Sequence, residues 1–369
     1  MIRILHTADV QIDATLPELG KQAQRRRSDL LHTFEHLVAL AIRENVHLFL
    51  VSGNLFATPR PEEAAVQRVS SALRRLTARG ILPVLLPGDC DGMMSPDSVY
   101  LRETFRNLLV LDGRDPASPE TIRVAGRTVH LYGFCQRGEQ PLPAENLRLD
   151  EEGCHVALMC FSTALHMEPT FLERVAQWGM DYLACAPSPQ WQTIEVGEQL
   201  FGAAPGSPEG YAFSHSGPRY AALAQVGGEQ MQLERREVNR RKLEIVTLEL
   251  DTYAEPQELT AAILDGARND LLRRVVLTGK PRFAIDPAQL IETCANAFYH
   301  LELRDMSHVF AGSLAERFLQ EPSSRGEFMR NAVQMSNELP HDEARLVEEA
   351  VRAVLATQGT TGEGTHEAD

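Results

Sequence analysis

The N-terminal quarter of the chain alternates between short apolar segments and longer amphipathic ones, and this alternation limits the fold more than any other feature. Segments 2–7, 46–52 and 81–86 have the length and composition of buried strands. Segments 25–44 and 62–79 carry apolar residues at spacings of three and four, as a helix with one buried face does. Parallel strands need such helical crossovers, and ligands gather at their carboxyl ends. The pattern predicts a parallel α/β sheet whose loops at Asp9, Asn54 and Asp89 meet along one edge.

The remaining chain divides into a second strand-rich part and a helical part. Strands are predicted at 121–124, 128–134, 155–161 and 181–185, a helix at 169–178, and a hairpin at 220–226 and 230–236 that segment 243–250 would extend. From Pro256 the pattern changes to helices at 256–268, 287–297, 313–319, 326–338 and 341–356, with one strand at 271–278. We predict domains at 1–253 and 254–357, and a disordered tail at 358–369, which is almost free of apolar residues.

Composition excludes several classes of protein. The 36 Lys and Arg against 51 Asp and Glu give a net charge of −15, the opposite of a dedicated nucleic-acid binder. The six cysteines form no C-x-x-C pair, and no charged-then-apolar leader opens the sequence, so we expect a cytoplasmic protein without a disulfide framework. No apolar run approaches the roughly 20 residues of a membrane helix, and no contact with a membrane is expected.

Four loops at predicted strand ends share polar residues and turn residues. They are His6-Thr7-Ala8-Asp9-Val10-Gln11, the segment 51–61 (VSGNLFATPRP), Leu86-Pro87-Gly88-Asp89-Cys90-Asp91, and the segment 182–189 (YLACAPSP). These loops resemble those of the calcineurin-like metallophosphoesterases, in particular the SbcD-type exonucleases of DNA double-strand-break repair, with the patterns HTADxHxG, GDLFD, PGNHD and ALGHxH. The segment 205–210 (PGSPEG) is also similar to that family. The resemblance covers Met1 to Leu250 and implies a four-layer α/β/β/α sandwich followed by a smaller α+β domain.

The family binds two metal ions through Asp, His and Asn side chains and activates a bridging water to attack a phosphodiester. In this chain, the resemblance keeps the first aspartate as Asp9. It places Gln11 where the family has a histidine, Asn54 where it has the metal-bridging aspartate, and Asp89 and Cys90 where it has its Asn-His pair. Cys160 takes the place of a further histidine, and Pro187 and Pro189 take the places of the last two.

These substitutions predict that the two-metal catalyst is lost. A neutral amide at Asn54 removes the negative charge that would lie between two repelling dications, and prolines offer no ligand atom in their side chains. We therefore expect no catalytic residue and no cofactor, with Gln11, Asn54, Cys90, Cys160, Pro187 and Pro189 as degenerate positions. The alternative is an enzyme with a remodelled single-metal site for manganese or zinc at Asp9, Asp89, Cys90 and Cys160, which would act as a DNA exonuclease or phosphodiesterase.

Two basic clusters could hold phosphates, with Arg25, Arg26, Arg240 and Arg241 as the candidate DNA-binding residues. The alternative interpretation is that each cluster is a solvated charged face. Because the chain as a whole is acidic, any DNA contact is expected to be weak or to depend on a partner.

The resemblance also implies a function and partners. It favours a non-catalytic structural or regulatory subunit in DNA repair, beside a coiled-coil ATPase of the SMC type and as a possible homodimer. Segments 287–297 and 342–355 are the candidate partner surface, because the second has an apolar stripe of Leu346, Val347, Ala350, Val351, Val354 and Leu355. The alternative is that this stripe packs within its own domain.

Overall fold

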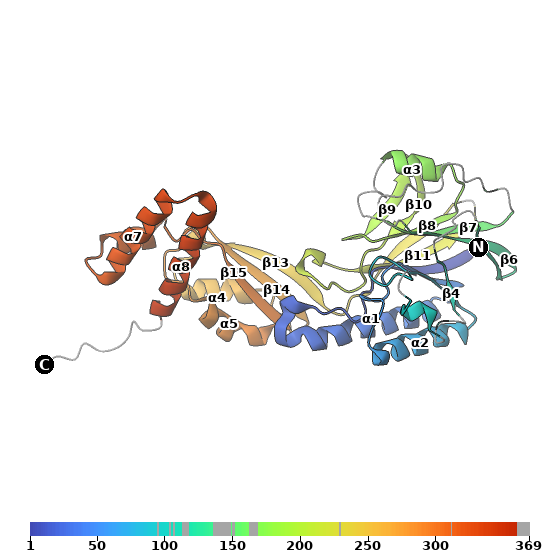
Figure 1. Ribbon diagram of the computed structural model, residues 1–369, viewed down its shortest axis with the longest axis horizontal. Helices are drawn as coiled ribbons and strands as arrows, with labels where there is room; N and C mark the ends of the chain where they lie inside the picture. The colour runs from blue at the N-terminus through green and yellow to red at the C-terminus, as the bar shows by residue number, and fades with distance from the viewer. Residues whose placement is uncertain are drawn as a thin grey trace. The chain divides into compact units, whose positions relative to one another are not determined.

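The computed structural model describes residues 1–369 except 94–95, 103–104, 106–107, 113–117, 136–148, 150–151, 162–168, 229, 311 and 360–369. The chain forms two compact units, Met1–Lys242 and Leu243–Asp369. Each is described by itself below, and their helices and strands are labelled in Figure 1.

The first sheet of the N-terminal unit has the predicted parallel arrangement. Strands β1 (Ile2–Thr7), β2 (Leu48–Ser52), β3 (Leu82–Leu86) and β4 (Leu109–Val110) run parallel in that order. Helices α1 (Ala23–Arg43) and α2 (Glu63–Thr77) connect the first three strands. The predicted hairpin, β11 (Tyr220–Val226) and β12 (Gln232–Glu237), adds to the free edge of β1 with antiparallel pairing.

The second sheet has the order β5-β6-β7-β8-β10-β9. Its strands are β5 (Glu120–Val124), β6 (Arg127–Cys135), β7 (Cys154–Cys160), β8 (Tyr182–Ala186), β9 (Gln192–Val196) and β10 (Gln199–Ala204), and helix α3 (Pro169–Ala176) precedes β8. The sequence predicted neither β9 nor β10. Both are short, β9 alternates with polar residues, and β10 contains a glycine and two alanines, so neither has a strong apolar run.

Three apolar layers hold these elements together. Between the two sheets lie Ile4 and Leu50 of the first sheet and Val156 and Leu158 of the second. The outer face of the first sheet packs on α1 and α2, and the outer face of the second packs on Phe171 and neighbouring residues of α3. The arrangement of layers is therefore α/β/β/α, which confirms the predicted fold class.

The C-terminal unit begins one strand earlier than predicted. Strand β13 (Lys242–Glu249) pairs with β14 (Leu271–Thr278), which pairs with β15 (His300–Asp305), so the prediction that segment 243–250 extends the first sheet is wrong. The pairing of β13 moves the division between the units from residue 253 to residue 242. The helices are α4 (Pro256–Leu264), α5 (Pro287–Cys294), α6 (Ser313–Gln320), α7 (Ser324–Glu338) and α8 (His341–Gly359). The predicted disordered tail lies outside the described residues from residue 360 on.

The apolar stripe of α8 divides between two roles. Val351 and Leu355 are buried in a cluster with residues of α6 and α7, and Val347 packs against it, so this part of the predicted partner surface belongs to the unit's own core. Leu346 remains 64% exposed. In α5, Leu290 and Cys294 are also buried against the C-terminal sheet.

Short 3₁₀ helices lie at Pro17–Gln22, Val99–Leu101, Phe213–His215, Leu250–Thr252 and Ala295–Ala297. No helix in the described part of the chain combines the length and the hydropathy that crossing a membrane requires.

A candidate site at the carboxyl ends of the parallel strands

The loops after β1, β2 and β3 meet, as the predicted topology requires. The amide nitrogen of Asn54 donates to Oδ1 of Asp9 at 3.0 Å, and Gln11 Nε2 donates to the same oxygen at 2.9 Å. The backbone N–H of Cys90 donates to Oδ1 of Asn54 at 3.0 Å. We call these four residues, Asp9, Gln11, Asn54 and Cys90, the rim network.

Main-chain hydrogen bonds hold the first two loops together independently of their side chains. The N–H groups of Asp9, Gln11 and Ile12 donate to the carbonyls of Gly53, Asn54 and Leu55, each at 3.0 Å. Asp9, Gln11 and Asn54 all have a left-handed backbone, with φ between 50° and 56°. Residues other than glycine rarely adopt this conformation, and such strain tends to persist at functional sites. The main-chain hydrogen bonds therefore hold these three residues in a left-handed backbone conformation.

A buried carboxylate, Asp91, braces the third loop. It accepts hydrogen bonds from the backbone N–H of Gly88 at 2.7 Å, from that of Phe56 at 3.0 Å and from the hydroxyl of Tyr100 at 2.6 Å. Burial raises the pKa of Asp91, although these hydrogen bonds oppose the shift. The sequence contained a signal for this role, because Asp91 closes the Pro-Gly turn that carries Asp89 and Cys90.

Both ends of the Asn54 side-chain amide are hydrogen-bonded within the rim network. A backbone N–H can only donate, so the Asn54 atom facing Cys90 must be the oxygen, and the NH₂ group must face Asp9. Oδ1 of Asn54 thereby accepts a hydrogen bond from the main chain, while the amide hydrogens of Asn54 point at the carboxylate of Asp9. Gln11 likewise turns its NH₂ group toward Asp9. These residues do not fit a two-metal centre.

The other candidate ligands, Asp89, Cys90 and Cys160, do not form a metal site either. Burial raises the pKa of Cys90, and nearby Asp9, Asp91 and Asp89 add to the shift while a hydrogen bond from Gln11 opposes it. Cys160 is buried, with its sulfur against Gly53, whereas Asp89 is exposed. Within the described ranges, no group of three His, Cys, Asp or Glu side chains could hold a metal ion.

The loop after β8, which contains Pro187 and Pro189, is held by an arginine from another loop. The guanidinium of Arg219 donates from Nη1 to the carbonyl of Pro189 and from Nε to that of Ser207, both at 2.8 Å. Arg219 is buried. Where the family has two histidine side chains, this chain therefore has a backbone carbonyl bound to an arginine.

Tyr211 also reaches the rim network, and the sequence analysis did not identify it. Its hydroxyl donates to Oδ2 of Asp9 at 3.4 Å, and its ring meets His215 edge-on at a centroid distance of 4.3 Å. Burial raises the pKa of Tyr211, and the charge of Asp9 adds to the shift. Tyr211 follows segment 205–210 directly, so the segment that carries part of the family resemblance also delivers this contact.

The candidate DNA-binding arginines separate into buried and exposed residues. Arg26 is fully buried, with Nη1 at 2.5 Å from Oε1 of Glu209 and 3.6 Å from Oδ2 of Asp29. Asp29 also pairs with Arg240 at 3.1 Å and Arg241 at 3.0 Å. We call these five residues the anchor cluster. The prediction that Arg26 presents its charge to a phosphate is wrong, because its guanidinium is buried and paired with Glu209 and Asp29.

Arg25 is exposed, and the side chain of Arg240 is 51% exposed despite its contact with Asp29. Arg241 is only 19% exposed. Of the four candidates, Arg25 and Arg240 remain accessible to a ligand.

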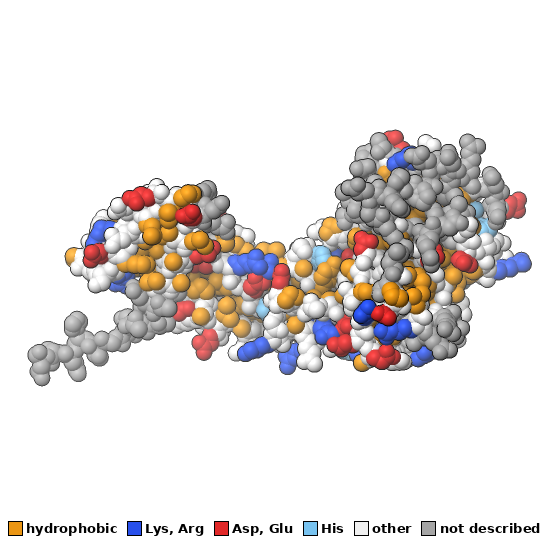
Figure 2. Space-filling model, in the orientation of Figure 1, with side chains coloured by type: hydrophobic (Ala, Val, Ile, Leu, Met, Phe, Trp, Pro, Cys, Tyr) orange, Lys and Arg blue, Asp and Glu red, His pale blue; other side chains and the backbone are white. Residues whose placement is uncertain are grey.

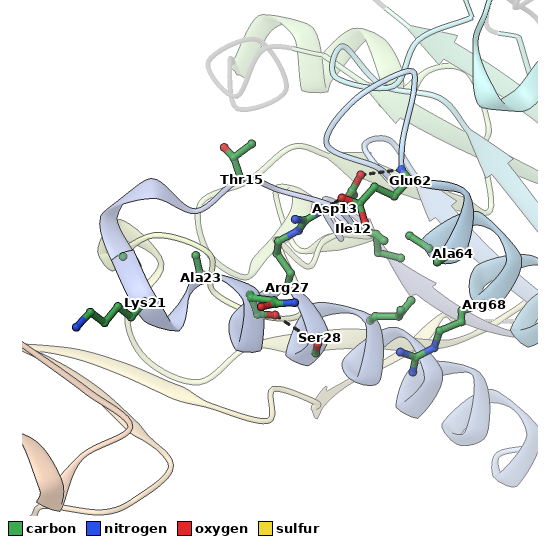
Figure 3. A pocket seen from close by; sticks show the side chains of 14 residues that line it. Ile12, Asp13, Thr15, Lys21, Ala23, Arg27, Ser28, Glu62, Ala64 and Arg68 are labelled. Carbon is green, nitrogen blue, oxygen red and sulfur yellow. Dashed lines mark hydrogen bonds and ion pairs between the residues drawn. The ribbon is translucent and has the colours of Figure 1, made fainter.

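A cavity with a volume of about 660 Å³ lies beside the first loop, between the starts of α1 and α2. Figure 3 shows the Arg27 side chain reaching Asp13, with Glu62 beside them. Arg27 forms ion pairs with both carboxylates, and these bonds raise its pKa. The two carboxylates that line the cavity are thus both paired with Arg27, and the other two cations of its lining are Lys21 and Arg68, of which Arg68 pairs with Glu35.

Comparison with known proteins gives partial matches. No family model matches the chain. The chain is 27% identical over 139 residues to the DNA double-strand break repair protein Mre11 of Sulfolobus acidocaldarius, which covers 36% of this chain and 33% of that protein. It is 34% identical over 101 residues to the Mre11 protein of Aeropyrum pernix, over 27% of this chain and 24% of that one. The Mre11 protein of Saccharolobus solfataricus is 33% identical over 94 residues.

The matched segments thus span a quarter to a third of the relatives' length. A crystal structure of TT1561 from Thermus thermophilus aligns over 63% of this chain and 98% of its own, with a TM-score of 0.36 and 12% identity, which is too low to support a conclusion. The four-layer core, the convergent loops and the partial Mre11 matches support the resemblance of this chain to the calcineurin-like metallophosphoesterases of the SbcD type.

Proposed function

We propose that the protein is a non-hydrolytic relative of the SbcD-type exonucleases and acts as a structural or regulatory subunit in DNA double-strand-break repair. The observation that supports this most strongly is the rim network, in which Asn54 is hydrogen-bonded at both ends of its amide. The Mre11 relatives carry DNA double-strand break repair in their names, which supports the repair context.

The charge at the rim supports the loss of hydrolysis. Two dications a few ångströms apart repel strongly, and carboxylates between and around them offset that repulsion. At this edge the chain offers Asp9, whose Oδ1 already accepts two amide donors, and the exposed Asp89. A metal at Oδ1 of Asp9 would displace the hydrogen bonds from Gln11 and Asn54, and neither of these side chains carries a negative charge that would offset the charge of the metal.

A metal assay tests this proposal directly. The purified full-length protein should contain no stoichiometric manganese or zinc, and it should not degrade duplex DNA ends when manganese is added. Asp9→Asn is the matched variant, because Asn keeps the shape and tolerates the left-handed backbone. Stoichiometric metal together with cleavage that Asp9→Asn abolishes would favour the alternative enzyme with a remodelled single-metal site.

The proposed partner is a coiled-coil ATPase of the SMC type. Figure 2 shows apolar side chains gathered over the helices of the C-terminal unit. Phe328, Met335 and Leu346 on α7 and α8 are 36%, 56% and 64% exposed. Exposed apolar groups on a helical pair favour contact with another helix. Met335→Glu with Leu346→Glu should weaken co-purification of the full chain with the ATPase, whereas changes of exposed charges in the N-terminal unit, such as Arg79→Glu, should not.

A weak DNA contact through Arg25 and Arg240 is part of the same proposal, as is a possible homodimer. Duplex binding by the full chain should fall with rising salt, and Arg25→Gln with Arg240→Gln should weaken it and reduce the salt dependence. Binding that is unchanged by both substitutions would place any DNA contact elsewhere. Sedimentation of the purified chain tests the dimer.

A further inference from the structure

Two cysteines lie side by side at the carboxyl ends of neighbouring strands in the second sheet. Strands β6 and β7 are parallel, and their register pairs Cys135 directly with Cys160. Both residues contribute to the apolar layer between the two sheets, so their side chains lie on the same face. Neighbouring strands are about 4.8 Å apart, which falls within the range of Cα separations that a disulfide spans.

The two thiols are also in contact. Cys160 is hydrogen-bonded to the side chain of Cys135, and this bond, together with burial, raises the pKa of Cys160 well above that of an ordinary thiol. The other cysteines of this sheet have no such neighbour, because Cys154 is paired in register with Val129 and Cys185 with Met159. Both partners are free thiols in the structure.

The two sulfurs differ in their exposure to solvent, and therefore in which of them an oxidant reaches first. Cys135 is partly exposed, whereas Cys160 is only 2% exposed, so a small oxidant reaches Cys135 first. The sulfur of Cys160 lies against Gly53, the residue before Asn54 of the rim network. A Cβ at residue 53 would come within 2.6 Å of that sulfur, which shows how closely the loop and the sulfur approach.

We propose that Cys135 and Cys160 form a reversible disulfide when the protein meets a peroxide, which makes this pair a redox-modification site next to the rim network. Hydrogen peroxide oxidises the Cys135 thiol to a sulfenic acid and releases water. The sulfur of Cys160 then attacks the sulfenic sulfur, the S–S bond forms, and a second water leaves with the proton of Cys160. Two thiols and one peroxide thus give one disulfide and two waters.

The disulfide would tie the last residue of β6 to the last residue of β7. It would also change how the Cys160 sulfur meets Gly53, because that sulfur would gain a covalent bond on its other side. The partly exposed sulfur of Cys135 is the atom of this disulfide that a reducing thiol would attack, so the modification is reversible. The inference stands whether or not the rim network is catalytic.

Peroxide treatment of the full-length protein, followed by alkylation and peptide mapping without reduction, tests the proposal. We expect a linked peptide pair containing Cys135 and Cys160, a fall in alkylatable thiols from six to four, and recovery of both thiols with dithiothreitol. Cys135→Ser should abolish the linked pair and leave Cys160 open to alkylation after unfolding. Cys185→Ser, a buried cysteine of the same sheet without a cysteine partner, should leave the linked pair unchanged.

Three outcomes would overturn the proposal. In the first, both thiols stay reduced at peroxide concentrations that oxidise Cys90, the other partly exposed cysteine of this unit. In the second, Cys135 passes to sulfinic acid without a linked peptide, and in the third, Cys135 links to a different cysteine. The thermal unfolding midpoint of each variant, measured in reductant, shows whether a lost link reflects lost chemistry or lost folding.

Discussion

The anchor cluster and the rim network are two buried polar groups of the N-terminal unit, and the segment 209–211 contacts both. They differ in the charge of the groups that face their buried ions. In the anchor cluster, Arg26 and Glu209 are both fully buried and each charge meets an opposite charge. In the rim network, Asp9 meets two neutral amides and a phenol. Glu209 belongs to the anchor cluster and Tyr211 contacts Asp9 of the rim network, so one short segment reaches both groups.

The comparison distinguishes charges that stabilise the fold, as in the anchor cluster, from charges that are needed only to bind a metal, as at the rim. A buried guanidinium without its carboxylate leaves an unpaired charge, which is costly in any state of the protein. A metal ligand is needed only while a metal is bound. The buried Arg26 and Glu209 of the anchor cluster are opposite charges in contact, whereas the rim has amides, a thiol and prolines at positions where the resembled family has metal ligands. The predictions below test this contrast, beginning with the largest effect.

Breaking the anchor cluster should cost the most stability. Arg26→Met keeps the volume of the side chain and leaves Glu209 buried without its cationic partner. We expect the free energy of unfolding to fall by about 3–5 kcal/mol, as for other buried pairs that lose one member. Urea unfolding measures this, and Arg25→Met, the exposed neighbour, should change stability by less than about 0.5 kcal/mol. Equal effects at the two positions would contradict the role of the cluster.

Acid should destabilise the protein through a buried histidine just before the rim. His6 bonds to Ser52 Oγ at 2.7 Å and to Tyr182 Oη at 3.1 Å, and burial lowers its pKa from 6.5 to about 3. Below pH 6.5 the unfolded chain binds a proton at this residue that the folded protein does not bind until about pH 3, so stability falls as pH falls through that window.

The loss should approach about 1.4 kcal/mol per pH unit, or roughly 2–3 kcal/mol at pH 4.5. His6→Gln should flatten the pH dependence of the unfolding midpoint between pH 6.5 and pH 4. His32→Gln, at an exposed histidine, should leave it as in the original chain. A slope that His6→Gln does not change would show that another group dominates.

Restoring one carboxylate to the rim should destabilise the protein unless a metal joins it. In Asn54→Asp, a second carboxylate replaces the donor that lies 3.0 Å from Oδ1 of Asp9, so a hydrogen bond becomes a repulsion. We expect a loss of about 1–3 kcal/mol in the presence of a chelator. Added manganese should recover part of it.

Asn45→Asp is the matched control for this change, because Asn45 is exposed and also has a left-handed backbone. It should be nearly neutral with or without manganese. If Asn54→Asp is equally neutral in chelator, the rim would hold more positive charge than the structure shows.

The smallest effect is expected at Tyr211. Its hydroxyl lies 3.4 Å from Asp9, near the limit of a useful hydrogen bond, so Tyr211→Phe should cost about 0.5 kcal/mol or less. Tyr100→Phe removes a 2.6 Å bond to the buried Asp91 and should cost about 1–2 kcal/mol. Thermal unfolding of the two variants measures the difference, and a reversed order would mean that Tyr211 holds Asp9 more firmly than its distance suggests.

Much of the first sheet could be predicted because its strands are short apolar runs separated by clear helical patterns. The meeting of the loops at Asp9, Asn54 and Asp89 followed from that topology alone, and in the structure Cys90, the neighbour of Asp89, makes the contact. Strand β13 was assigned to the wrong sheet because its local pattern fits either pairing, and only contacts with β14 decide it. Tyr211 and Arg219 reach the site from a loop far along the chain, and no local pattern reveals such a contact.

The burial of Arg26 could have been predicted from helical spacing. Arg26 stands in a run of three arginines, yet it lies four residues before Leu30 and eleven before Leu37, both of which are buried in α1. Helical spacing therefore puts Arg26 on the buried face and Arg25 beside it on the solvent side. A charged residue on the core stripe of a helix predicts a buried partner, which here is Glu209.

The main-chain bonds between the first two loops have a consequence for how such a site can change over evolutionary time. The three N–H to C=O bonds from residues 9, 11 and 12 to residues 53, 54 and 55 do not involve side chains, and the bridge between Ile12 and Phe56 continues them. Side chains at Gln11 and Asn54 can therefore be exchanged while the loops keep their course. An ancestral ligand set could drift away without unfolding the protein, and a new one could be installed on the same two loops by substitution alone.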